Sequence, residues 1–144
     1  MSEIPGVVHR LVDPNNCNSR PQRVLVGIIN GDLDIPQFPC QLKVLDLHTA
    51  DWLGKQGHFH TYAELYFVLE GEATFDLVDH RATGNAQRYV VKKGQLLFIP
   101  ARVAHRAYGT AGLIMIALTE QPYQEGSDIP HNLSPLGPVP YGLE

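Results

Sequence analysis

Two histidines and one glutamate lie within seven residues, in the segment His58-Phe59-His60-Thr61-Tyr62-Ala63-Glu64. Side chains two residues apart in a strand point to the same face, so His58 and His60 present their nitrogens to one point. Glu64 joins them if the strand continues, or from a neighbouring strand if residues 61–63 form a tight turn. Imidazole and carboxylate groups that converge in this way are ligands of divalent transition metals. The segment therefore predicts a metal site.

A second pattern follows, in which Gly94 and Pro100 flank the apolar segment 95–99 and His105 comes after a short turn. With Gly71 included, the two patterns are His-x-His-x3-Glu-x6-Gly and Gly-x5-Pro-x4-His. In spacing and order this pair resembles the two sequence motifs of the cupin family, over roughly residues 40–118. The resemblance implies an all-β fold, the double-stranded β-helix or jelly-roll barrel of cupins.

The same resemblance implies four metal ligands, namely His58, His60, Glu64 and His105. Three imidazoles and a carboxylate suit Fe, Mn, Co, Ni, Cu or Zn and do not single out one of them. A purely structural zinc site is closed and commonly rich in cysteine, so this ligand set favours a site that works on a bound molecule. If the metal is six-coordinate, two positions are left for water or substrate.

Three positions depart from the family pattern without removing a ligand. Trp52 stands where the first motif has a glycine, Arg102 where the second has a glycine, and Gly109 where the second has an asparagine. These changes concern the turns around the ligands.

Other side chains are candidates for roles beside the metal. Strand alternation directs Tyr66 to the face of Glu64, where it could donate or accept a proton or simply fill the barrel. Arg102 and Arg106 flank His105 and are expected near the barrel mouth, either gripping a carboxylate or phosphate of a substrate or lying solvated on a turn. His48 precedes the first motif and is a candidate for supporting a ligand.

Short apolar and β-branched segments separated by Gly, Pro, Asn and Asp predict an antiparallel barrel or jelly-roll sandwich without a long helix. We expect residues 1–22 to form an N-terminal arm, 23–121 the barrel, and 122–144 an extended C-terminal tail, because the last segment holds five prolines and three glycines. The expected strands are 23–29, 41–47, 65–69, 73–78, 87–91, 95–99, 105–108 and 113–118.

Composition excludes several classes of function. The formal net charge is −4 and the eleven basic residues are scattered, which argues against nucleic acid as a partner. No apolar run reaches the length of a membrane span, and the first residues lack the basic and apolar regions of a secretion signal, so we expect a cytoplasmic protein.

Cys17 and Cys40 have no zinc or redox spacing. A homodimer is expected from the fold resemblance and the prevalence of twofold symmetry.

The resemblance alone leaves the reaction open, because cupins host many activities. We weigh three hypotheses. The favoured one is a metal-dependent isomerase, epimerase or lyase acting on a small oxygen-rich substrate, such as a sugar derivative or a ketone. The alternatives are an Fe(II) dioxygenase and a cupin that binds a metal or small ligand without turnover.

Overall fold

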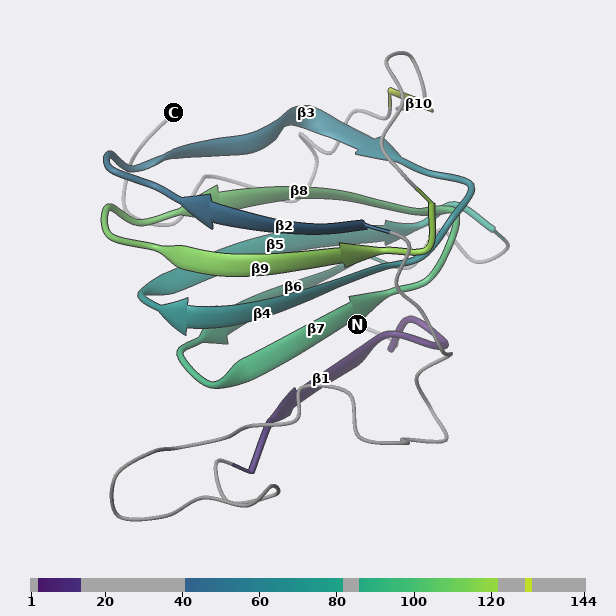
Figure 1. Cartoon of the computed structure of the whole chain (residues 1–144). Coiled ribbons are helices and arrows are strands. Elements are labelled where there is room, and N and C mark those ends of the chain that lie inside the picture. Colours follow the sequence, from purple (N-terminus) through teal and green to yellow (C-terminus); the bar gives the residue numbers. More distant parts are fainter. Residues whose placement is uncertain (1–2, 14–40, 82–85, 122–128, 131–144) are drawn as a thin grey trace.

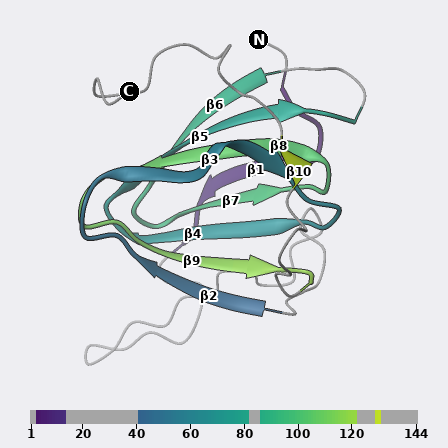
Figure 2. The same cartoon turned by 90° about the horizontal axis from the view of Figure 1, so that it is seen from above.

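The computed structural model describes residues 3–13, 41–81, 86–121 and 129–130, which form ten strands in two five-stranded sheets (Figure 1). One sheet has the order β1-β7-β4-β9-β2 and the other β10-β3-β8-β5-β6, with antiparallel pairing throughout (Figure 2). The described residues contain no helix long and apolar enough to span a membrane. The strands are β1 Val8–Leu11, β2 Gln41–Asp46, β3 Asp51–Phe59, β4 Glu64–Glu70, β5 Glu72–Asp79, β6 Ala86–Lys92, β7 Gln95–Ile99, β8 Val103–Gly109, β9 Ile114–Thr119 and β10 Ile129–Pro130.

The all-β jelly-roll prediction is confirmed, and seven of the expected strands match β2 and β4–β9 to within two residues at either end. The expected strand 23–29 lies outside the described residues, as do residues 122–128 and 131–144 of the expected tail. Within the expected arm, β1 pairs with β7, and within the expected tail, β10 pairs with β3 at His58 and Phe59. The domain boundaries stay a prediction.

Strand alternation gives the first sheet two apolar faces. On β4, Val68 belongs to the cluster between the sheets, whereas Leu65 and Phe67 belong to a second cluster on the opposite face. Because both faces are buried, β4 and β7 are almost continuously apolar in the sequence. The cluster between the sheets, which surrounds the site described below, includes Ile4, Val68, Phe75, Leu77, Leu97, Ile99, Val103, Leu113 and Met115.

A large irregularity in β3 sets the direction of the first histidine. Leu53 pairs with Ala107 and His58 pairs with His105, so five steps along β3 correspond to two along β8. Gly57, at φ 120°, lies in the extra length of chain. An unbroken strand would place residues 53 and 58 on opposite faces, but the bulge turns both toward the space between the sheets.

Gly71 closes the β4–β5 turn at a position that admits no side chain. Its φ is +82°, and a Cβ there would lie 2.9 Å from Leu113 Cα. Gly112 has a similar φ of +87° with nothing within 4 Å of the added atom, so it is a matched control. We expect Gly112→Ala to lose about 1 kcal/mol of unfolding free energy through backbone strain alone. Gly71→Ala should lose a further ~1–3 kcal/mol, because a backbone atom must move.

Urea denaturation of the two variants and the parent chain measures the difference. Equal losses for the two alanine variants would contradict the close approach of Leu113.

Candidate functional site

The three histidines of the two motifs meet between the sheets. His58 lies near the end of β3, His60 just beyond it, and His105 near the start of β8. The centre of the His58 ring lies 4.7 Å from the centre of the His60 ring and 4.6 Å from that of the His105 ring. One nitrogen from each ring falls within 4.8 Å of the others. The structure thus brings together three of the four predicted ligands as a group able to hold a metal.

Glu64 reaches the cluster from the other sheet. Residues 61–63 turn the chain from β3 into β4, so Glu64 approaches from a neighbouring strand, as in the second of the two sequence alternatives. Its Oε1 lies 3.1 Å from His60 Nε2, and its Oε2 lies 3.1 Å from His105 Nε2. The Tyr66 hydroxyl donates a hydrogen bond of 2.5 Å to the same Oε2. All four sequence-predicted ligands and Tyr66 therefore share one site.

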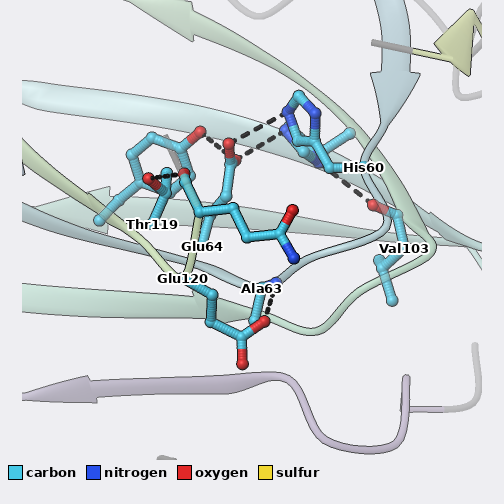
Figure 3. Close-up of polar contacts among 9 residues, drawn as sticks. His60, Ala63, Glu64, Val103, Thr119 and Glu120 are labelled. Carbon is cyan, nitrogen blue, oxygen red and sulfur yellow. Dashed lines mark hydrogen bonds and ion pairs between the residues drawn. The ribbon is translucent and has the colours of Figure 1, made fainter. Parts of the chain in front are cut away.

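The turn between His60 and Glu64 is held at both ends, and Figure 3 shows the end at which Ala63 contacts Glu120. The Arg102 amide donates to the His60 carbonyl over 2.8 Å. The Glu120 carboxylate accepts from the Ala63 amide over 2.8 Å, and the Glu120 amide donates to the Ala63 carbonyl over 3.2 Å. No motif in the sequence pointed to Glu120, because its partner is a backbone group 57 residues away.

Glu64 is ionised although only 5% of its surface is exposed. Burial by itself disfavours the charged carboxylate. Interactions with the His105 and His60 rings, whose Nε2 atoms lie 3.1 Å from its oxygens, outweigh burial and hold the pKa of Glu64 well below its ordinary value. The site therefore carries a fixed negative charge that calls for a positive partner.

His105 shows what kind of partner fits. Its Nδ1 lies 3.1 Å from the Val103 carbonyl oxygen, and we assign the proton to Nδ1 because that oxygen can only accept. A neutral ring held this way turns the lone pair of Nε2 toward the Glu64 carboxylate. That contact is favourable only if positive charge lies between the two groups, either a proton on Nε2 or a metal ion. A backbone carbonyl that fixes the far nitrogen is also the usual support of a metal-bound histidine, so these residues fit a metal.

A cavity of about 70 Å³ adjoins the cluster. His58, Tyr66 and His105 line its polar side, and apolar side chains including Leu53, Phe75 and Met115 line the rest. Pockets for whole drug-sized ligands measure about 300–1,000 Å³. The cavity is thus the size of a few atoms, and it suits the reacting part of a substrate.

The two candidate arginines lie elsewhere. Arg106 is on the opposite face of β8 from His105: its Nη2 lies 3.2 Å from Asp76 Oδ2, and its guanidinium stacks 4.5 Å from the centre of the Trp52 ring. Arg102 is exposed on the turn between β7 and β8. Neither lines the cavity, so their roles in substrate binding stay predictions. The His48 side chain is 85% exposed and lies 4.0 Å from Asp46, which leaves it outside the cluster.

Comparison with protein families decides what kind of domain this is. Residues 52–118 match the family model described as "Cupin domain". They form a cupin domain. The matched stretch of the cupin contains all four predicted ligands, and the resemblance noted in the sequence is confirmed. None of the curated proteins compared with the chain matches it.

Several solved structures share the fold. The TDP-fucose-3,4-ketoisomerase WlaRA from Campylobacter jejuni has a TM-score of 0.67 at 16% identity, covering 85% of this chain and 87% of its own. QdtA, a sugar 3,4-ketoisomerase from Thermoanaerobacterium thermosaccharolyticum in complex with TDP, has 0.68 at 15%, covering 88% and 89%. The 3,5-epimerase RmlC from Legionella pneumophila, in complex with dTDP-4-keto-L-rhamnose, has 0.69 at 16%, covering 93% and 77%. At these identities the likeness shows that the cupin fold is shared.

Arg102 has a φ of +65°, the only positive value at a non-glycine among the described residues. The left-handed conformation costs a residue with a side chain about 1–2 kcal/mol, which a glycine would avoid. Glycine also loses more chain entropy on folding, and this offsets roughly 0.5–1 kcal/mol of that benefit. We therefore expect Arg102→Gly to raise the unfolding free energy by roughly 0.5–1 kcal/mol. Arg102→Ala, which keeps the strain, should bring no gain. Chemical denaturation tests this, and a glycine variant less stable than the alanine variant would contradict the strain.

Removing one imidazole tests the metal site. We expect the wild-type chain, loaded anaerobically with Fe(II), Mn(II), Ni(II) or Zn(II) in turn, to bind about one equivalent of at least one metal. Saturating metal should also raise its melting temperature, since binding to the native state alone adds stability. His60→Ala should lose both effects, whereas His48→Ala, a change at an exposed histidine, should keep them. Metal analysis and thermal unfolding provide the readouts, and a full metal complement in His60→Ala would rule out the assignment.

Proposed function

We propose that this cupin is an isomerase or epimerase of a keto sugar, in which a proton moves between carbon atoms at or beside a carbonyl group. The observation that carries the proposal is a series of close contacts. The Tyr66 hydroxyl donates to the Glu64 carboxylate, that carboxylate lies 3.1 Å from His60 and His105, and Tyr66, His58 and His105 line one small cavity. The activities described for WlaRA, QdtA and RmlC support the same class of reaction.

The reaction needs a base for a C–H proton and a donor for an oxygen. When a hydroxyl-bearing carbon beside the carbonyl loses its proton, the C–H electron pair forms a C=C bond and the carbonyl oxygen takes up a proton, which gives an enediol. If a proton then adds to the former carbonyl carbon and the hydroxyl on the first carbon gives up its proton, the isomeric ketone forms. If a proton instead adds to the other face of the first carbon and the former carbonyl oxygen gives up its proton, the epimer forms. Both outcomes use the same two groups.

Tyr66 is suited to move one of these protons. Its hydroxyl borders the cavity and is already oriented by Glu64, which stays ionised and can only accept from it. An imidazole that borders the cavity, His58 or His105, is suited to take the other proton. If the four predicted ligands hold a metal, that metal would polarise the carbonyl as a Lewis acid. The ligated imidazoles then have no free lone pair, and proton transfer at carbon falls to Tyr66.

Deuterium uptake from D₂O tests the proposal whichever product forms. TDP-4-keto-6-deoxyglucose is the first substrate to use, and NMR would follow exchange at carbons beside the carbonyl, with metal-loaded and with chelator-treated protein. We expect exchange with the wild-type chain and a ~10²–10⁴-fold lower kcat for Tyr66→Phe, with little change in KM, because the lost group transfers a proton. Tyr89→Phe, a change at a half-buried tyrosine on β6, should keep the wild-type rate.

An absence of exchange with TDP-, UDP- and GDP-linked keto sugars, under both metal conditions, would refute the isomerase. Oxygen uptake by the iron-loaded protein would then favour the dioxygenase, and ligand binding without turnover would favour the binding protein.

A further inference from the structure

One row of side chains crosses the inner face of the first sheet at the level of Tyr66. Lys43 on β2 pairs with Ala117 on β9, Ala117 pairs with Tyr66 on β4, and Tyr66 pairs with Leu97 on β7. Residues directly opposite in antiparallel strands point to the same face. Tyr66 faces the cavity, so Lys43 is on the cavity side of the sheet, at the strand that pairs only with β9 among the described residues (Figure 2).

The neighbouring residue on β2 supports this orientation. Leu45, two positions after Lys43, packs against the cluster between the sheets. Leu42 and Val44 are 59% and 61% exposed on the opposite face. Lys43 therefore shares the inner face with Leu45, by strand alternation.

Exposure along the row shows where the barrel opens. Leu97 is fully buried, Tyr66 and Ala117 are half-buried, and Lys43 is exposed. In the next row toward the turn that carries Glu64, Glu64 and Thr119 are buried and Gln41 is half-buried. In the row on the other side, Val68 and Met115 are likewise buried and Leu45 is half-buried. Of the three rows, only that of Lys43 has no buried side chain between β2 and β4, which makes it the most exposed approach to the level of Tyr66.

We propose that substrate enters over Ala117 and that the Lys43 ammonium holds a phosphate-type anion of that substrate while its keto group lies beside Tyr66. Two strand spacings of ~4.8 Å separate Lys43 from Tyr66 along the sheet, so one elongated molecule spans both. Ala117 has the smallest side chain that a non-glycine residue can have, and it leaves room between them. The cavity itself takes only a few atoms, which leaves the charged part of the substrate outside, at Lys43. The proposal rests on the proposed function and adds that the keto sugar is carried on a phosphate or diphosphate.

Lysine suits this role because its ammonium is a point charge on a flexible stem, which binds phosphate without a fixed geometry. The chain as a whole is acidic, at a formal net charge of −4. An exposed cation at the opening therefore supplies local attraction for an anion that the rest of the surface does not favour.

Calorimetric titration with TDP, inorganic pyrophosphate and thymidine tests the anion site without turnover. We expect the wild-type chain to bind TDP more tightly than thymidine. Lys43→Gln should weaken binding of TDP roughly ten- to hundred-fold, the range for loss of a charged hydrogen bond, and leave thymidine unaffected. Lys92→Gln, a change at an exposed strand lysine of the other sheet, is the matched control and should bind TDP like the wild type. Binding of both pyrophosphate and TDP would indicate a site that recognises the phosphates alone. Binding of TDP without pyrophosphate would indicate a site that also needs the nucleoside.

A second variant tests the path. Ala117→Leu should keep the wild-type melting temperature to within a few degrees, since the position is half-buried, but should slow deuterium exchange of the keto sugar at least ten-fold.

The proposal is overturned if Lys43→Gln binds TDP as the wild type does, if TDP and thymidine bind the wild type equally, or if neither TDP nor pyrophosphate binds. If Lys43→Gln weakens the binding of TDP but no keto sugar exchanges deuterium, the anion site is kept and the isomerase is rejected. If Lys43→Gln and Ala117→Leu both exchange deuterium at the wild-type rate, the isomerase is kept, and the anion site and the path are rejected.

Discussion

The buried carboxylate of Glu64 is the interaction on which the rest of the site depends. A charge so far from water is tolerated only when its partners are close and well oriented. Its partners come from both sheets: His60 and His105 approach from the side of β3 and β8, and Tyr66 from its own strand. Glu64 therefore ties the sheets together electrostatically at the place where their hydrophobic packing is interrupted by a cavity. The loss of any one partner leaves part of that charge uncompensated.

The surrounding fold serves to bring these groups within hydrogen-bond distance. The bulge in β3 turns His58 inward, and the contacts made by Arg102 and Glu120 fix the turn between His60 and Glu64. Arg102 makes its contact from the turn between β7 and β8, in a backbone conformation that glycine adopts more easily. Strain at such a position is typical of functional regions, where neighbouring contacts determine the geometry.

The sequence predicted much of this arrangement. The His-x-His spacing, the turn residues and His105 indicated one cluster inside a barrel, and the alternation of β4 placed Tyr66 beside Glu64. The bulge between Leu53 and His58 was not predictable, because its length depends on the pairing with β8. Arg106 follows His105 directly in β8, so strand alternation turns it away from the face of His105, and the pairing of β8 with β5 brings it to Asp76. The position of Lys43 was not predictable either. Alternation shows which residues of a strand share a face, but the face that points into the barrel is known only once the neighbouring strands are known.

The first strand has a practical consequence for handling the protein. Val8–Leu11 covers the edge of β7, whose residues Leu96, Leu97, Phe98 and Ile99 are all buried. An uncovered apolar strand edge is a template for pairing between chains. A chain trimmed to the barrel alone, or carrying a fusion placed directly against Val8, would expose that edge and favour aggregation. The segment that contains β1 is best kept whole in any expression or crystallisation work.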